Sequence, residues 1–467
     1  MGSTGESNPP PADSLQWLGK PRPVRVIVVG AGISGIAAVK LFNEMLGYQP
    51  VSLTIYEKND DVGGTWLENR YSGCSCDIPA HGYTYSWEGN PDWSRLYIGA
   101  EEIFDFYKGR AEAYGVFKRL KLLHRVVQAI WSEERGKWEL EIEDLANDRT
   151  FTNKAKVLIN AGGYLKFIPG LDSYEGTLIV VVIGSGSSVI QIVPRLQKVT
   201  KYLFSFVRSP IWITPEFGGE FAASEGRNTM FTTEQRITWR NDSAKFLQLC
   251  KALELGSITP GHGYLEALVE DNVTVIGGGI RRLIIKGLKI NDGKLFKVNV
   301  IICVTSFNII YRPSFKELRS YISVAASGFP NYFIVMGLNF PLINGTIVLC
   351  MESTLKYVFK VVRLIQTEGV KSMSSKEMAV EDFQVYKDRL MKEFVWISSC
   401  RSWYKNRLAN GKVWGPWLRS AVHFIELLER PRWEDYKIKY LAGNWFDFLE
   451  KGVSRREANG GDLAWFV

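Results

Sequence analysis

The chain has 467 residues, of which 46% are hydrophobic and 23% are charged, and its formal net charge is +8. This length is sufficient for two or three domains with a sizeable core. The 57 basic residues are spread along the chain, so no nucleic-acid-binding tract is expected. The six cysteines form no CxxC pair and there are only four histidines, so no metal site is expected either.

The N-terminal segment, residues 1–20, is polar and rich in proline and is predicted to be a disordered tail. It lacks the apolar core of a signal peptide. The longest apolar region, residues 332–351, is interrupted by Asn, Pro and Gly. We therefore expect no transmembrane segment. Together with the scattered thiols, this predicts a cytoplasmic location.

A nucleotide-binding signature follows the tail. The apolar strand 24–29 leads into a GxGxxG turn formed by Gly30, Gly32 and Gly35, and then into apolar residues at helical spacing. The first glycine permits the tight turn, the second lets a pyrophosphate approach, and the third lets the helix pack on the strand. The next strand ends at Glu57, whose carboxylate suits ribose hydroxyls. The combination predicts a dinucleotide site.

Residues 60–87 read DDVGGTWLENRYSGCSCDIPAHGYTYSW. This stretch resembles the flavin-side motif of the class B flavoprotein monooxygenases, and within them the fungal Baeyer–Villiger monooxygenases. One departure is Ser72, where that family usually has proline. Further matches, such as PGHGYLEAL at 260–268 and RPRWEDY at 430–436, extend the resemblance over almost the whole chain.

The resemblance implies an FAD- and NADPH-dependent monooxygenase. Such an enzyme uses O2 to insert an oxygen atom beside the carbonyl of a ketone, here in secondary-metabolite biosynthesis, with a polyketide or terpenoid as the expected substrate. By resemblance, the FAD would be lined by Thr65, Trp66, Leu67, Glu68, Asp77 and Tyr83, and the nicotinamide would lie near Ser75, Cys76 and Asp77. Considered by itself, Asp77 is more typical of a turn or cap; its place in the motif favours a catalytic role. Val127 is expected to meet the adenine side of FAD through its backbone, with a buried strand valine as the alternative.

A second strand–turn–helix signature lies at residues 177–196. Its predicted pyrophosphate site consists of the turn glycines, the hydroxyl groups beside them and one glutamine: Gly184, Ser185, Gly186, Ser187, Ser188 and Gln191. Val189 replaces the third glycine. Its branched side chain is expected to cost ~1–3 kcal/mol by overpacking unless the helix shifts outward.

The strand after this helix ends in Val207 and Arg208 rather than in an acid. A guanidinium there suits a ribose 2′-phosphate and predicts NADPH rather than NADH. The alternative is a solvated arginine.

Several departures from the family pattern concern the second site. The family's linker fingerprint, FxGxxxHxxxW, couples the two domains as NADPH binds, but this chain has no His or Trp between Gly163 and Gly184. The position of the family's active-site arginine holds Ser257, which cannot supply the charge; losing one such donor typically costs ~10²–10³ in rate. The stretches 208–260 and 309–325 are shorter than usual in the family, and residues 232–249 predict one helix.

The predicted fold is α/β, with two dinucleotide-binding (Rossmann-like) three-layer domains and a helical, aromatic C-terminal region. Residues 21–165 would form the first part of the FAD domain, residues 175–300 the inserted NADPH domain, and residues 301–467 the second part of the FAD domain with the substrate pocket. Two alternatives stay open. One is a flavoprotein hydroxylase or isomerase without Baeyer–Villiger activity, and the other is a non-catalytic or mis-spliced remnant. The oligomeric state and the regiochemistry are not predicted.

Overall fold

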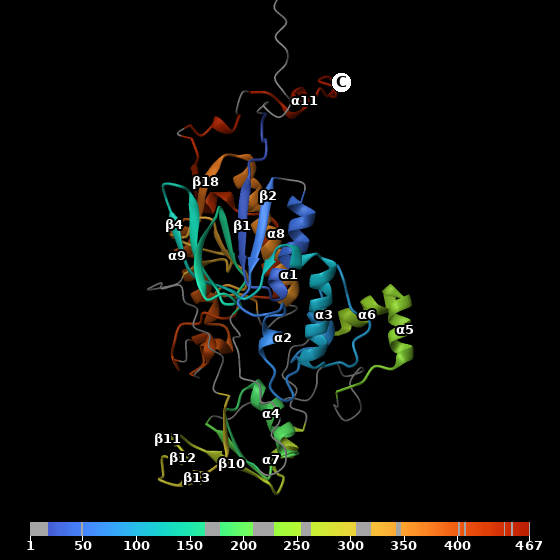
Figure 1. Ribbon diagram of the computed structural model, residues 1–467, viewed down its shortest axis with the longest axis vertical. Coiled ribbons are helices and arrows are strands. Elements are labelled where there is room, and N and C mark those ends of the chain that lie inside the picture. Colours follow the sequence, from blue (N-terminus) through green and yellow to red (C-terminus); the bar gives the residue numbers. More distant parts are fainter. Residues whose placement is uncertain are drawn as a thin grey trace, which may run out of the picture.

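The structure is a computed structural model that describes residues 17–47, 50–163, 178–208, 228–253, 263–304, 319–341, 347–399, 402–405, 408–442, 444–449 and 452–466. Two α/β units of unequal size follow one another along the long axis of the molecule (Figure 1). Most of the predicted tail, residues 1–16, lies outside the described residues. Leu18 is described, and its N–H donates to the carbonyl oxygen of Val453.

The larger unit is built on a seven-stranded sheet with the order β15–β16–β17–β7–β1–β2–β3. From β17 to β3 the neighbours run parallel, whereas β15 and β16 are antiparallel. Central parallel strands are covered on both faces, which explains apolar runs such as VIVV at residues 26–29 of β1. The strands are β1 (Val24–Val29), β2 (Val51–Tyr56), β3 (Leu120–Lys121), β7 (Val157–Asn160), β15 (Ser320–Tyr321), β16 (Ala325–Ala326) and β17 (Tyr332–Ile334).

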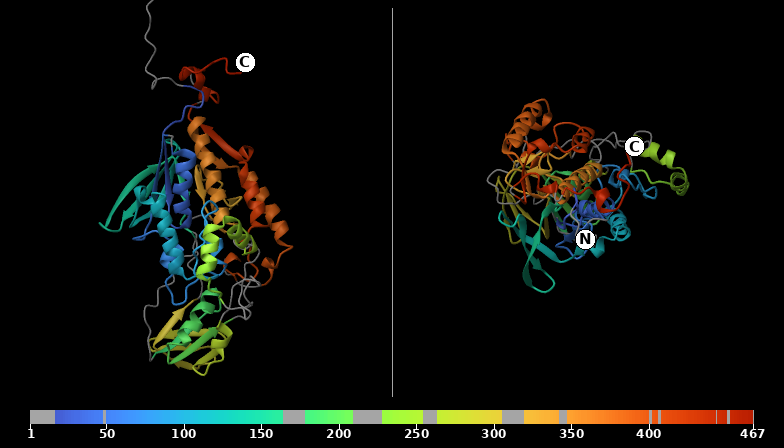
Figure 2. Two further views of the ribbon diagram at one scale, coloured as in Figure 1. Left: turned by 90° about the vertical axis from the view of Figure 1, so that its right-hand side faces the viewer. Right: turned by 90° about the horizontal axis from the view of Figure 1, so that it is seen from above.

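The two faces of this sheet bury different side chains of β1. Val26 and Val28 lie in a core shared with the helices α1 (Ile33–Leu46), α3 (Ala100–Ala113), α8 (Ile347–Thr367) and α10 (Ala421–Glu429). Ile27 belongs to a second core with the antiparallel sheet β4–β5–β6. The strands of that sheet are β4 (His124–Ser132), β5 (Lys137–Asp144) and β6 (Arg149–Ala155). The alternation gives the three layers visible in Figure 2.

The smaller unit has a four-stranded parallel sheet with the order β10–β9–β8–β14. Two helices share a core with it, and a meander of three strands shares another. The elements are β8 (Ile179–Ile183), α4 (Ser187–Gln197), β9 (Tyr202–Val207), α7 (Tyr264–Leu268), β10 (Val273–Gly277), β11 (Ile280–Ile284), β12 (Gly287–Ile290), β13 (Leu295–Lys297) and β14 (Val300–Cys303).

Two helices, α5 (Thr233–Asn241) and α6 (Ser243–Leu253), occupy the stretch for which we predicted one. The chain breaks at Asp242, which has an extended backbone (φ −129°, ψ 92°). Its carboxylate accepts hydrogen bonds from the backbone N–H groups of Ala244 and Lys245, both at 3.1 Å. The single-helix prediction was therefore wrong, because a local aspartate cap competes with helix continuation.

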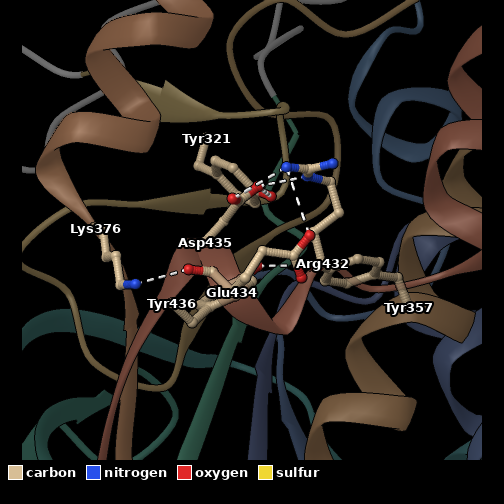
Figure 3. Close-up of polar contacts among 7 residues, drawn as sticks. All are labelled: Tyr321, Tyr357, Lys376, Arg432, Glu434, Asp435 and Tyr436. Carbon is tan, nitrogen blue, oxygen red and sulfur yellow. Dashed lines mark hydrogen bonds and ion pairs between the residues drawn. The ribbon is translucent and has the colours of Figure 1, made fainter.

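The C-terminal region adds a two-stranded sheet and further helices to the larger unit. A polar network ties this region to the seven-stranded sheet (Figure 3). In it, Tyr321 of β15 donates to Asp435, and Arg432 donates to the same carboxylate at 2.8 Å. The hydroxyl groups of Tyr357 and Tyr436 lie 2.7 Å apart. The RPRWEDY segment therefore serves as an attachment point in this fold.

The remaining elements are short or peripheral. They are α2 (Thr65–Glu68), α9 (Glu377–Met391), α11 (Arg455–Ala458), β18 (Val370–Ser375), β19 (Tyr436–Tyr440), and the 3₁₀ turns η2 (Ala80–Tyr83), η3 (Val116–Lys118), η4 (Val395–Ile397), η5 (Trp403–Lys405), η6 (Trp433–Asp435) and η7 (Asp447–Leu449). In the described part of the chain, no helix combines the length and apolar character needed to cross a membrane. The same residues contain no group of three His, Cys, Asp or Glu side chains that could hold a metal ion.

The predicted α/β fold class, with two Rossmann-like units, is confirmed.

Candidate functional site

The first glycine-rich turn joins β1 to α1 and has no room for side chains. Gly30 has φ +103°, and a Cβ there would lie 2.7 Å from the carbonyl oxygen of Ala161. A Cβ on Gly35 would lie 2.1 Å from the carbonyl oxygen of Gly30. Both distances are far inside van der Waals contact, so the tight turn and the close helix packing require glycine at these two positions.

The N-terminus of α1 lies against a second pair of glycines. Gly32 is the N-cap, no side chain caps this end, and the first turn carries no acidic residue. A Cβ on Gly64, which has φ +55°, would lie 2.9 Å from Cα of Gly32. Unpaired N–H groups and the positive end of the helix dipole favour an anion at such a helix end. This narrow main-chain cradle fits the pyrophosphate of a dinucleotide.

Glu57 follows β2 and lies at the same turn, although it is 26 residues from Ala31. Its side chain is buried, and its carboxylate accepts the backbone N–H of Ala31 at 2.7 Å and that of Asn59 at 2.9 Å. These bonds hold the carboxylate beside the glycine turn, where the sequence predicts a ribose contact.

The short helix α2 supplies the next group of predicted flavin residues. Trp66 and Leu67 are buried, and the Trp66 ring meets the ring of Tyr83 edge to face, with centroids 5.2 Å apart. Glu68 accepts hydrogen bonds from Lys58 and Asn59, so its charge is paired within the protein. Thr65 is half-buried at the start of the helix. The structure thus brings α2 and Tyr83 together next to the first glycine turn.

Asp77 is accessible to solvent but surrounded by many protein atoms. Desolvation raises the pKa of its carboxyl group, and hydrogen bonds, including one from Tyr83, oppose that rise only partly. The Tyr83 hydroxyl lies 3.4 Å from Oδ1 of Asp77. In the described part of the chain no cation lowers the pKa of Asp77. Among the residues that the structure describes, Asp77 therefore has no cationic partner that would hold it fully ionised.

The residues before Asp77 are held by the main chain. Ser75 forms an isolated antiparallel bridge with Gly99, and the backbone N–H of Ile98 donates to Sγ of Cys76 at 3.2 Å. Burial raises the pKa of the Cys76 thiol well above its usual range, so it stays protonated at neutral pH. Cys76 is thus a neutral, packed residue in this loop.

The second glycine-rich turn repeats the geometry of the first. Gly184 has φ +137°, and a Cβ there would lie 2.3 Å from the carbonyl oxygen of Val304. Val189 is fully buried, and its Cγ2 lies 3.2 Å from that Cβ position. The structure thus seats the branched side chain directly against the glycine. Gly186 is the exposed N-cap of α4, and nothing lies within 4 Å of a Cβ there.

The hydroxyl-bearing residues of this turn have different surroundings. Ser185 is half-buried and Ser187 is exposed, whereas Ser188 is buried 3.2 Å from the hydroxyl of Tyr71. The amide of Gln191 is engaged by the larger unit: it accepts from Tyr71 at 2.9 Å and donates to the carbonyl oxygen of Ser75 at 3.0 Å. The two units therefore meet at α4.

Val207 and Arg208 lie at the carboxyl end of β9, where the half-buried Val207 precedes the exposed Arg208. Val127 lies on β4 at a register shift between Val126 and Gln128. It is 45% exposed, so the alternative of a buried strand valine is wrong. Its neighbour Val126 packs against the core, so the alternation of side chains along the strand directs Val127 away from it.

Two predicted features lie outside the described residues: Ser257, and the linker segment 164–177. Two further residues belong to the site although the sequence assigned them no role. Gly64 lies within the GGxW part of the motif, and its φ of +55° marks it as part of the cradle. Tyr71 lies in the RYSG part and reaches across to α4. In the sequence, only their positions within the motif at residues 60–87 could have indicated that these two residues belong to the site.

Two dinucleotide-binding folds that meet at an aspartate-bearing loop define an oxidoreductase with two nucleotide cofactors. Residues 28–98 match the model of the NAD(P)-binding Rossmann-like domain. The FAD-binding monooxygenase tazF of Aspergillus terreus is 30% identical over 96% of this chain and 95% of its own length. A Baeyer–Villiger monooxygenase of Streptomyces coelicolor is 26% identical over 89% of this chain and 92% of its own length. Cyclohexanone monooxygenase of Rhodococcus sp. Phi1, bound to NADP+, has a TM-score of 0.73 at 20% identity, covering 90% of this chain and 100% of that one.

The chain therefore belongs to the family of FAD-binding monooxygenases. The predicted family is confirmed, and so is the prediction of an FAD- and NADPH-dependent monooxygenase. The alignment with tazF extends over 535 residues, more than the 467 of this chain, so it includes positions that this chain lacks.

Proposed function

We propose that the protein inserts one oxygen atom of O2 beside the carbonyl group of a ketone, using FAD and NADPH. The observation that carries this proposal is the position of the loop that holds Asp77. The loop begins beside the glycine cradle of the first turn, and its Ser75 accepts a hydrogen bond from Gln191 of α4, which follows the second glycine turn. A Baeyer–Villiger monooxygenase among the relatives supports the same reaction. A role in secondary metabolism is part of this proposal, and a fungal FAD-binding monooxygenase, tazF, is among the relatives.

The residues present fit FAD at the first turn. The Gly32–Gly64 cradle would take the pyrophosphate, Glu57 would take the ribose, and α2 with Tyr83 would line the ring system. The flavin supplies the redox chemistry and the activation of O2. The protein's own contribution is to bind, to orient and to exclude water.

The second turn fits a nicotinamide dinucleotide. The exposed N-terminus of α4, with Gly186 as its cap and no acidic residue in its first turn, suits a pyrophosphate. Arg208 at the end of β9 suits a 2′-phosphate, which favours NADPH. The side chain of Arg208 is exposed.

Asp77 is the proposed catalytic carboxylate, since it lies on the loop between the two sites. Its pKa is raised, and Tyr83 is its hydrogen-bond donor. A cation bound next to this carboxylate would lower its pKa and keep it ionised, and the ionised carboxylate would attract the cation.

The same carboxylate supports a second candidate function. By resemblance, Ser257 stands at the position of the family's arginine, and no described cation lowers the pKa of Asp77. A flavoprotein that oxidises NADPH but hydroxylates or isomerises its substrate would not need the positive charge of that arginine.

One experiment distinguishes these functions. FAD-loaded protein is mixed anaerobically with NADPH, and bleaching of the flavin is followed by absorbance. The reduced protein is then exposed to ¹⁸O2 with a panel of bulky ketones. Label in an ester or lactone supports the proposal. Bleaching with label only in a hydroxyl group, or with no label, favours the second candidate, and a flavin that never bleaches contradicts both.

A further inference from the structure

The loop that leads to Asp77 is anchored inside the smaller unit. Tyr71 is only 7% exposed, and it belongs to the same core as Val189 and Ile190 of α4. Cys74 packs against the cores of both units. A segment of the larger unit thus completes the core of the smaller one.

Three hydrogen bonds reinforce this anchor. The Tyr71 hydroxyl lies 2.9 Å from Oε1 of Gln191 and 3.2 Å from Oγ of Ser188, and Nε2 of Gln191 donates to the carbonyl oxygen of Ser75 at 3.0 Å. Burial raises the pKa of the Tyr71 hydroxyl far above its ordinary value, so it keeps its proton. It can therefore donate to the Gln191 oxygen while it accepts from Ser188.

The main chain of the loop lies directly against α4. Gly73 has φ +81°, and a Cβ there would lie 2.8 Å from the carbonyl oxygen of Gln191 and 2.8 Å from Cγ of Arg195. The loop cannot slide along the helix without breaking these contacts. A displacement of α4 must therefore displace residues 71–75 as well.

We propose that Tyr71 and Gln191 are positioning residues that couple nucleotide binding at the first turn of α4 to the placement of Asp77. Ser188 belongs to the predicted pyrophosphate turn, and Ser75 lies two residues before Asp77, so the contacts connect the two sites directly. The chain lacks the linker fingerprint that couples the domains in the family, and this anchor supplies an alternative path. The inference rests on the proposed function only in that NADPH is the nucleotide.

The test compares wild type with Tyr71→Phe and Gln191→Met, which keep the packing volume but remove the hydrogen bonds. Tyr202→Phe is the matched control, because it removes a hydroxyl that lies 2.7 Å from Thr274 in the same unit, away from the loop. NADP+ is titrated into FAD-loaded, oxidised protein. The readouts are the change in the flavin absorption spectrum and the hydrogen exchange of the peptide that contains residues 71–77.

In wild type and in Tyr202→Phe, NADP+ is expected to perturb the flavin spectrum and to slow exchange in the loop. Each variant of the anchor is expected to keep its FAD but to bind NADP+ about five- to tenfold more weakly, with a smaller spectral change and no protection of the loop. Because the two variants share the loss of the Tyr71–Gln191 bond, their effects in the double variant should be smaller than the sum of the single effects.

Unchanged NADP+ affinity and loop protection in both variants would overturn the coupling, as would a wild-type loop that ignores NADP+. If one variant fails to fold, the other gives the answer. A wild-type protein that shows the NADP+ response but oxygenates no ketone would refute the proposed reaction and leave the coupling standing.

Discussion

The main chains of Gly32 and Gly64 touch, since a Cβ on Gly64 would come within 2.9 Å of Cα of Gly32. The two glycines are 32 positions apart, and one caps α1 while the other caps α2. Two helix N-termini therefore converge on one small region. The first-turn N–H groups of α2 are already bonded, Trp66 to Gly63 and Leu67 to Gly64, so a diphosphate here would draw on the N–H groups of α1.

Gly64→Ala is expected to prevent FAD retention. The new Cβ clashes with Gly32, and φ +55° is unfavourable for alanine, so we expect a loss of ~1–3 kcal/mol in the free energy of unfolding. FAD content is measured from the absorbance of the purified protein, and stability by urea unfolding. The control is Gly109→Ala in α3, where nothing lies within 4 Å of the new Cβ and where alanine favours the helix. A Gly64→Ala protein as yellow as wild type would refute the cradle.

Asp77→Asn is expected to lower the rate of oxygenation by ~10²-fold or more while FAD stays bound. The reason is that the substitution removes the negative charge of the proposed catalytic carboxylate. The same variant should be more stable than wild type at neutral pH. The folded-state pKa of Asp77 is raised, so wild type loses stability as the pH increases through the ordinary value of 3.8, and asparagine does not.

Thermal unfolding of the flavin-free proteins at pH 4 and pH 7 checks this sign. The difference between Asp77→Asn and wild type should widen toward pH 7. Asp271→Asn, which removes an exposed carboxylate, is the control for a loss of charge alone. A stability difference that is independent of pH would show that Asp77 is not desolvated.

His81→Phe is expected to stabilise the protein and to reduce its sensitivity to acid. His81 is buried against the rings of Phe231, Trp239 and Phe246, and neither ring nitrogen has a hydrogen-bond partner. Burial lowers the pKa of His81 from 6.5 to about 4. Between pH 6.5 and pH 4 the unfolded chain therefore binds a proton at His81 that the folded protein does not bind. Over this range the free energy of unfolding of wild type falls by ~3 kcal/mol.

Urea unfolding at pH 7.5 and pH 4.5 measures this loss. Phenylalanine should remove most of it and should add ~1–3 kcal/mol at neutral pH, because no unpaired nitrogen is buried. The control His124→Phe removes a ring whose Nδ1 has a partner, the carbonyl oxygen of Leu122 at 2.6 Å, and it should keep the acid loss. An equal acid loss in His81→Phe and wild type would contradict the prediction.

Tyr321→Phe is expected to destabilise the protein by ~1.5–3 kcal/mol without loss of FAD, because it removes a hydrogen bond to an ionised group. Partial burial raises the pKa of Asp435, but the hydrogen bonds from Arg432 and Tyr321 outweigh it and lower the pKa overall. This stabilisation is complete above pH 3.8 and disappears as the pH falls toward the lower folded-state pKa.

Urea unfolding at pH 7 and pH 3.5 should therefore show that the gap between Tyr321→Phe and wild type narrows in acid. Tyr386→Phe, which alters an exposed tyrosine on α9, should change stability by less than ~0.5 kcal/mol. Equal stability of Tyr321→Phe and wild type at pH 7 would mean that Asp435 is held by Arg432 alone.

Local patterns predicted the elements that frame the first site. The apolar run of β1, the glycine turn and the acid after β2 are all short-range features. The break between α5 and α6 was missed, because a cap at Asp242 outweighs the helical pattern.

Contacts between distant segments could not be predicted in the same way. Tyr71 and Gln191 are 120 residues apart, and nothing near either residue in the sequence indicates the other. The exposure of Val127 depends on which face of β4 meets the core, and only the packed sheet defines that face. Such features arise from packing of complete elements, which single-residue patterns do not encode.

The pairing of β17 with β7 has a consequence for synthesis of the chain. Tyr332 joins Leu158 only after the whole smaller unit has emerged from the ribosome. Until then the parallel sheet of the larger unit presents an unpaired edge, which exposes backbone groups to other chains. A nascent chain interrupted before residue 330 would consequently keep this edge open to association with other chains.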